Sequence, residues 1–245
     1  MGQRTIKAVI FDLDNTLTDF MRAKDEAILA AIDAMIDCGL PLSAREAHRR
    51  IYGIYQDEGI EYQRVFDRFL KQELGGVDFR MLAAAVVAYR RARDGSLVLY
   101  PHATMVLNRL LRDGYGMAVV SDAPRFEVWL RICRLGLHHH FDHVFTHDDT
   151  GARKPDPAPF RMALEQLAVS PDEAVMIGDW PSRDITGARD LGIHTVWARY
   201  GDASPPYKDP AAIAAEVPHA ETAEFIVDDL SQLLDVLDEL NGGAR

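Results

Sequence analysis

Two aspartates lie two residues apart near the amino terminus, where a short apolar segment ends. Asp12 and Asp14 follow residues 6–11, which we predict to form a β-strand. Side-chain direction in a strand repeats every two residues, so both carboxylates can face the same side. Neighbouring carboxylates repel each other unless a cation lies between them or one of them holds a proton. The pair therefore indicates a functional site.

Composition limits what such a site can serve. The chain has 245 residues, 48% of them hydrophobic, enough for one large α/β domain or two smaller ones with a real core. The formal net charge of −11 disfavours nucleic acid and anionic membranes as partners. We therefore expect a small-molecule substrate, and either a monomer or a homodimer.

Cysteine spacing and hydropathy indicate the compartment in which the protein works. Cys38 and Cys133 are far apart and form no Cys-x-x-Cys pattern, so neither a disulfide framework nor a zinc site is expected. No stretch resembles a signal peptide or approaches the roughly 20 apolar residues that span a bilayer. We expect a soluble, cytoplasmic protein.

Residues 20–98 have a purely helical pattern. Apolar residues recur at helical spacing in four successive stretches, interrupted by glycine and proline. Ser43 and Glu46 have the spacing of a capping box, which predicts the start of the second helix. Four helices in succession predict a small bundle, which we assign to residues 20–96.

From about residue 97 onward, strand and helix patterns alternate, as in a parallel sheet with crossover helices. The expected strands are 6–11, 117–120, 144–146, 174–177, 194–197 and 225–227. The expected helices are 104–112, 126–135, 159–167, 185–191 and 230–240. Residues 1–19 and 97–245 would then form one α/β domain, with the helical domain inserted after its first strand.

Polar residues follow several of these strands. Ser121-Asp122 and Gly178-Asp179 come directly after strands, Lys154 lies in the loop after 144–146, and Asp184 lies five residues beyond Asp179. In an open parallel sheet, ligands bind outside the carboxyl ends of the strands. These residues are therefore candidates for one site together with Asp12 and Asp14.

In this order, the residues resemble the four motifs of the haloacid dehalogenase (HAD) superfamily. The matching residues are Asp12-Leu13-Asp14-Asn15-Thr16, Ser121, Lys154-Pro155-Asp156 and Gly178-Asp179 with Asp184. The resemblance extends over about residues 6–197. It implies an α/β fold, with a Rossmann-like core whose mostly parallel sheet is flanked by helices, and an inserted cap resembling a four-helix bundle.

The resemblance also implies a role for each residue. Asp12 is the expected nucleophile and forms an aspartyl-phosphate, while Asp14 acts as general acid and then as general base. Ser121 and backbone amides, including that of Asp122, would bind the phosphoryl oxygens. Lys154 would neutralise the negative charge on those oxygens and on Asp12.

A Mg²⁺ ion is the implied cofactor, because a carboxylate approaches a dianionic phosphate only when charge is neutralised. Its expected ligands are Asp12, the backbone carbonyl of Asp14, and Asp179. Asp184 would either bind the ion directly or hold the residues and water molecules that bind it. An acid at a helix start is also favoured by the helix dipole, so a purely structural role for Asp184 stays open.

The predicted function is hydrolysis of a small phosphorylated metabolite. A phosphomutase of β-phosphoglucomutase type shares all four motifs and is the enzymatic alternative. A catalytically silent phosphate-binding module is the alternative from another class. Dehalogenation is disfavoured, because a halide leaving group needs no proton and Asp14 would have no task.

Other residues are less informative. The histidines between His138 and His147 lack partners at metal-ligand spacing, so a surface loop is the simpler interpretation. Asp122, Trp180, Pro181 and Arg183 depart from the residue types common in the family. They could reshape the mouth of the site.

Overall fold

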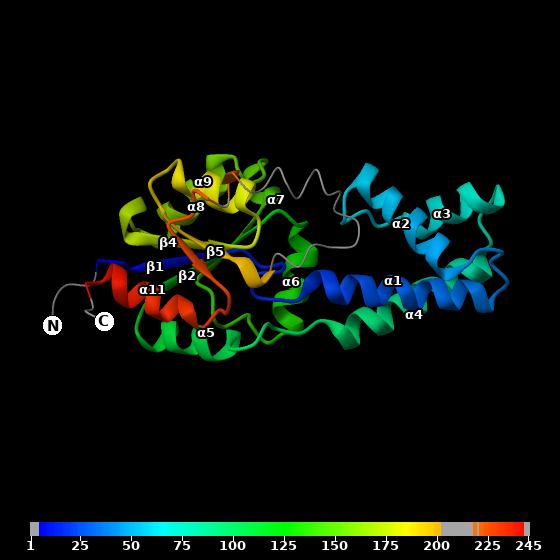
Figure 1. Cartoon of the computed structure of the whole chain (residues 1–245), viewed down its shortest axis with the longest axis horizontal. Coiled ribbons are helices and arrows are strands. Elements are labelled where there is room, and N and C mark those ends of the chain that lie inside the picture. The colour runs from blue at the N-terminus through cyan, green and yellow to red at the C-terminus, as the bar shows by residue number, and fades with distance from the viewer. Residues whose placement is uncertain (1–4, 202–217, 220, 243–245) are drawn as a thin grey trace. The chain divides into compact units, whose positions relative to one another are not determined.

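A computed structural model describes residues 5–201, 218–219 and 221–242 of the chain (Figure 1). Among these residues, Phe20–Val98 form one compact unit, and the residues on either side of them form the other. None of the described helices combines the length and the apolar character needed to cross a membrane.

The described residues of the α/β unit contain a six-stranded sheet in the order β3-β2-β1-β4-β5-β6. The strands are β1 (Ala8–Phe11), β2 (Gly116–Ser121), β3 (His143–Thr146), β4 (Ala174–Gly178), β5 (His194–Ala198) and β6 (Phe225–Val227). Every neighbouring pair is parallel. This confirms the predicted α/β fold class, and each strand lies within two residues of its predicted bounds.

Helices cover both faces of this sheet (Figure 1). On one face lie α5 (Ala103–Arg112), α6 (Arg125–Arg134) and α11 (Gln232–Leu240), and on the other α8 (Pro157–Leu167) and α9 (Thr186–Arg189). Strand β1 alternates between the faces: Val9 and Phe11 join the first core, Ala8 and Ile10 the second. Burial on both faces explains why the strands are almost continuously apolar.

Short elements absent from the sequence prediction complete this unit. They are α7 (His147–Thr150), η1 (Pro171–Glu173), η3 (Arg199–Gly201) and the π-helical turn η2 (Pro181–Ile185). The prediction of a helix at 185–191 was wrong in its bounds, because η2 occupies Ile185 and α9 ends at Arg189. The sequence also predicts a long loop at 200–220, and most of it lies outside the described residues.

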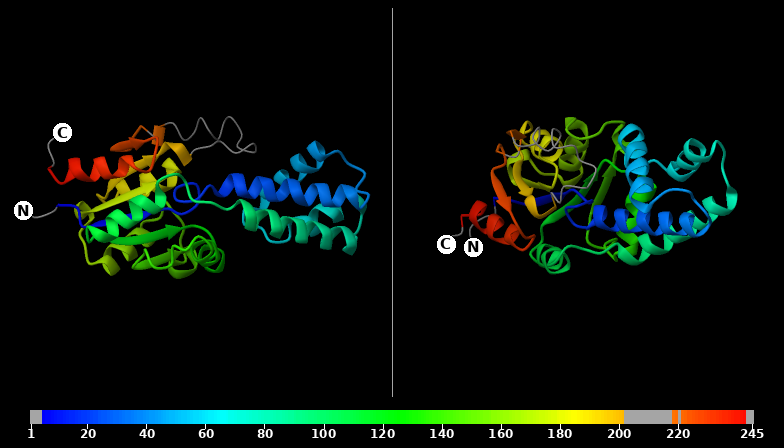
Figure 2. Two further views of the ribbon diagram at one scale, coloured as in Figure 1. Left: turned by 90° about the horizontal axis from the view of Figure 1, so that it is seen from below. Right: turned by 45° about the vertical axis from the view of Figure 1, so that its right-hand side comes forward.

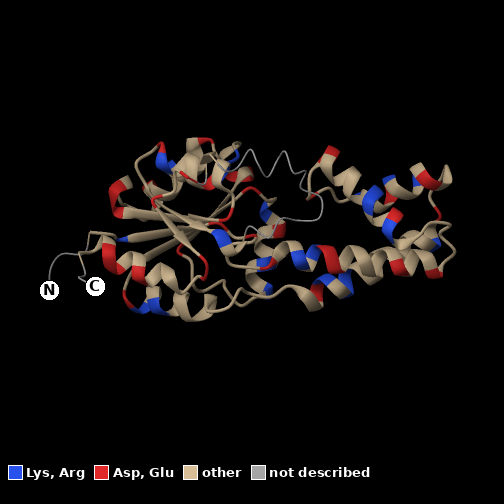
Figure 3. Cartoon of the chain, viewed as in Figure 1, with Lys and Arg blue, Asp and Glu red and all other residues tan. Residues whose placement is uncertain are grey.

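The second unit consists of α1 (Phe20–Asp37), α2 (Ala44–Glu58), α3 (Val65–Leu74) and α4 (Phe79–Ser96). Helices α1 and α4 lie side by side along most of their length (Figure 2). The capping box predicted at the start of α2 is present, with Ser43 and Glu46 bonding to each other's backbone amides. Acidic and basic side chains are mixed along these helices (Figure 3).

The apolar face of each helix in this unit contributes to one core, which includes Ile28, Ile32, Ile51 and Phe69. One buried residue breaks the apolar pattern: the Nζ atom of Lys24 lies 4.7 Å from the centroid of the Tyr55 ring. Cation–π attraction of this kind stabilises an ammonium group that has left water.

Candidate active site

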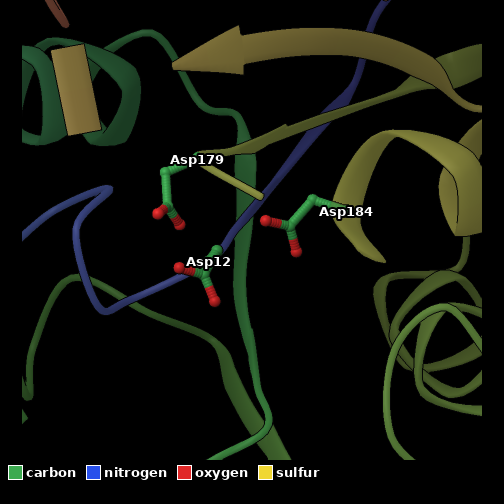
Figure 4. A group of neighbouring side chains, drawn as sticks. All are labelled: Asp12, Asp179 and Asp184. Atoms are coloured by element: carbon green, nitrogen blue, oxygen red, sulfur yellow. The ribbon is translucent and has the colours of Figure 1, made fainter. Parts of the chain in front are cut away.

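Three buried carboxylates converge where the strand order of the sheet reverses. Strand β1 lies between β2 and β4. Asp12 directly follows β1, and Asp179 directly follows β4. Asp184 comes from the π-helical turn after β4. One carboxylate oxygen from each residue lies within 4.8 Å of the other two, and the side chains point toward one another (Figure 4). This edge is where ligands bind in open α/β sheets.

The glycine before Asp179 makes room for Asp184. A Cβ atom on Gly178 would lie 2.3 Å from Oδ2 of Asp184. The same oxygen accepts a hydrogen bond of 3.0 Å from the backbone amide of Trp180. Gly178 and this amide together fix Asp184 against the end of β4.

Lys154 joins the acidic residues from the loop before α8. Its Nζ atom donates to Oδ1 of Asp12 at 2.6 Å, lies 2.6 Å from Oδ1 of Asp184, and donates to the carbonyl of Val120 at 3.1 Å. The side chain is only 3% exposed. An ammonium group in this position neutralises carboxylates that otherwise repel each other.

Burial controls the protonation of this cluster. Burial raises the pKa of Asp12 above its ordinary value, against the opposing effect of Lys154. Burial, together with the charge of Asp12, raises the pKa of Asp184 to about 6. Burial alone would lower the pKa of Lys154, but the charges of Asp12, Asp184 and Asp122 outweigh it and raise that pKa. Lys154 therefore remains an ammonium at neutral pH.

The donor set fits a hard divalent cation. Three carboxylates meet one ammonium group, so the cluster is short of positive charge. Carboxylate oxygens are the ligands that Mg²⁺ prefers. Asp12, Asp179 and Asp184 would supply these ligands, while the predicted contribution of the Asp14 carbonyl stays a prediction.

Ser121 and Asp122 lie beside this cluster at the end of β2. The Ser121 hydroxyl is buried and accepts a hydrogen bond of 3.2 Å from the Ala123 amide. The Asp122 carboxylate accepts a bond of 2.9 Å from the Lys154 amide and pairs with Arg183 at 3.3 Å. This carboxylate thus braces the lysine loop, while the phosphate contact of the Asp122 backbone amide stays a prediction.

Two unusual residues after Asp179, Trp180 and Arg183, contact each other. The Arg183 guanidinium lies over the Trp180 ring, 3.8 Å from its centroid, while also pairing with Asp122. Three of the four residues that depart from the family pattern, Asp122, Trp180 and Arg183, therefore form one connected group. Stacking of a guanidinium on an indole ring stiffens such a loop.

The Asp14 side chain has a partner that the sequence prediction missed. Its Oδ2 atom lies 3.1 Å from Nη1 of Arg131, whose side chain is 7% exposed. Arg131 lies on the buried face of α6, next to Val128 and Ile132. An arginine within a helix's apolar stripe is the signal that could have identified it.

Residues at the end of β5 and directly after it support the loops that carry Asp12 and Asp179, and the sequence analysis also missed this role. The Trp197 indole donates to the Asp179 carbonyl at 3.2 Å, and the Tyr200 hydroxyl donates to the Thr16 carbonyl at 2.7 Å. Gly201 is buried against the Asn15 carbonyl. Trp197, Tyr200 and Gly201 belong to none of the four motifs, so the motif pattern provided no signal.

We predict that Gly201→Ala damages stability and activity together. A Cβ atom at this position would lie 1.7 Å from the Asn15 carbonyl oxygen and 2.9 Å from Cβ of Asp179, so both loops would have to move. Overpacking of this kind costs about 1–3 kcal/mol. Denaturant unfolding measures the cost. Gly53→Ala is the control, because its Cβ atom would meet nothing within 4 Å.

The histidine segment lies apart from these contacts. His140 bonds to Asn108, and the rings of His138 and His139 contact each other. Among the described residues, none of the histidines between His138 and His147 belongs to a group of potential metal ligands.

Comparisons with known proteins give a consistent result. The model of the haloacid dehalogenase-like hydrolases matches residues 6–192. The glyceraldehyde 3-phosphate phosphatase of Pyrococcus furiosus is 33% identical over 242 residues, covering 99% of this chain and 97% of the relative. That of Methanopyrus kandleri is 35% identical over 240 residues, covering 96% and 98%. The crystal structure of a HAD phosphatase from Thermococcus onnurineus superposes with a TM-score of 0.65 at 26% identity, covering 95% and 98%.

Proposed function

The chain belongs to the haloacid dehalogenase-like hydrolases, and we propose that it is a Mg²⁺-dependent phosphatase of small phosphorylated metabolites. The contact that carries this proposal is the ammonium group of Lys154 between Asp12 and Asp184. The positive charge of Lys154 favours the ionised form of Asp12, which the proposed attack on phosphorus requires.

In the first step, an oxygen of Asp12 attacks phosphorus while the bond from phosphorus to the leaving oxygen breaks. The products are an aspartyl-phosphate and an alcohol, and Asp14 donates the proton that the leaving oxygen requires. Lys154, Ser121 and the Asp122 amide neutralise and hold the phosphoryl oxygens in this step.

In the second step, water attacks the aspartyl-phosphate and Asp14 accepts a proton from it. Inorganic phosphate leaves, and Asp12 is restored as a carboxylate. Splitting one difficult displacement into two makes each step easier. Mg²⁺ bound by Asp12, Asp179 and Asp184 would supply charge neutralisation at the phosphoryl group.

The proposed substrate class is a small phosphomonoester, with glyceraldehyde 3-phosphate as the first compound to test. Relatives that are 30–35% identical over most of their length are named for that substrate. The cytoplasmic location, the helical unit's role as a cap, and the lack of nucleic-acid and membrane partners stay predictions.

Phosphate release from a panel of phosphomonoesters tests the proposal. We expect turnover of glyceraldehyde 3-phosphate with Mg²⁺, a loss of at least about 100-fold with EDTA, and recovery when Mg²⁺ is restored. Turnover that EDTA leaves unchanged contradicts the metal requirement. Absence of turnover on every compound favours the silent phosphate-binding module.

The phosphomutase alternative is tested on hexose phosphates. A phosphomutase would convert one isomer to another with little release of inorganic phosphate, whereas a phosphatase releases phosphate stoichiometrically. Measuring both products in one reaction separates the two activities.

A further inference from the structure

Arg131 is a buried charge that the proposed steps leave without a task. It lies in α6, between apolar residues that join the core of the sheet, and only 7% of its side chain is exposed. Burying a guanidinium costs much free energy unless it is paired. One charged partner is Asp14, at 3.1 Å from Nη1 to Oδ2.

This contact holds the Asp14 carboxylate through one of its two oxygens. A contact of this kind restricts rotation of the carboxylate and so sets the direction in which its oxygens face. A carboxylate that acts as general base must face the attacking water within hydrogen-bond reach, so the orientation of the Asp14 side chain matters in the second step.

We propose that Arg131 is a positioning residue for the second step, holding the Asp14 carboxylate in the orientation from which it accepts the proton of the attacking water. The proposal rests on the function proposed above. It goes beyond that function because Arg131 belongs to none of the four motifs and lies 117 residues from Asp14.

The expected effect is confined to hydrolysis of the aspartyl-phosphate. With p-nitrophenyl phosphate, the leaving group departs without a proton, so the first step does not need Asp14. In Arg131→Met, we expect kcat to fall about 10- to 100-fold, as for a misplaced catalytic group. KM should fall in parallel, so that kcat/KM changes less than about threefold.

A burst of nitrophenolate in stopped flow is the decisive readout. Arg131→Met should release about one nitrophenolate per active site rapidly and then turn over slowly, because the aspartyl-phosphate accumulates. Arg131→Lys keeps the charge without the guanidinium geometry and should give an intermediate steady-state rate. If Arg131→Met does not fold, Arg131→Lys alone must show the burst.

Two comparisons separate positioning from a structural role. Arg134→Met removes an exposed arginine from the same helix and should leave kcat unchanged. In an Asp14→Asn background, Arg131→Met should lower kcat no further, because the group that it positions is already absent.

The inference is overturned if the Arg131 variants lower kcat and kcat/KM equally without a burst, or if Arg131→Met and Asp14→Asn act additively. Failure of the proposed function looks different: Asp12→Asn would keep its turnover. An enzyme that depends on Asp12 and lacks the burst would contradict the role of Arg131 alone.

Discussion

Replacing Asp12 by asparagine should abolish turnover while leaving the protein folded. The amide has the shape of the carboxylate, but it is a poor nucleophile and carries no charge for Lys154 or a metal. Loss of a nucleophile removes most of the catalytic acceleration, so we expect kcat to fall by at least about 10⁴-fold. Steady-state phosphate release with purified protein measures this.

The same substitution should not lower stability. Burial raises the pKa of Asp12, so its ionised form costs folding free energy at neutral pH. The neutral amide of Asp12→Asn removes that cost, and Lys154 would keep Asp184 as its partner. We expect the Tm to stay the same or rise. Asp172→Asn, at an exposed site, is the control and should retain activity. Full activity of Asp12→Asn would contradict the mechanism.

Replacing Lys154 by methionine should damage both stability and activity. The substitution keeps the approximate volume but leaves Asp12 and Asp184 buried without their cation. Removing one partner of a buried ion pair costs about 3–5 kcal/mol. We therefore expect a large fall in the free energy of unfolding, measured by denaturant titration, and loss of phosphate release.

A divalent cation should partly replace the missing charge in this variant. An ion that binds only the folded state stabilises it, so Mg²⁺ should raise the Tm of Lys154→Met more than that of the wild type. Lys7→Met is the matched control, because Lys7 pairs with Glu173 at the surface with 47% of its side chain exposed. Exposed pairs contribute little, so this control should unfold like the wild type. Equal unfolding of the two variants would contradict the role of Lys154.

Periodicity was sufficient to predict the α/β fold class. The apolar stretches of the sheet are buried on both faces, and their alternation with helices leaves a parallel sheet as the simple solution. The predicted bounds of helices were less accurate where polar groups outside the apolar pattern determine where a helix starts. The Asp156 side chain caps α8 and starts it at Pro157, and the carbonyl of Trp180 accepts the first bonds of η2.

The motif residues could be found because each of them immediately follows a strand or lies in a loop at the same sheet edge. Connectivity alone places Asp12 and Asp179 at the carboxyl ends of parallel strands, whatever the details of packing. The family resemblance then assigned their roles, and family membership is confirmed by the comparisons.

By itself, the sequence determined the family, the succession of strands and helices along the chain, and that Asp12 and Asp179 lie at the same sheet edge, since these follow from motifs, local patterns and strand direction. Only the tertiary structure decided the partners of those acids. Arg131, Tyr200 and Gly201 lie more than 100 residues from Asp14, Thr16 and Asn15, the residues of the first loop that they contact. Contacts between such distant segments depend on how side chains fill the space around the sheet, and no local period encodes them.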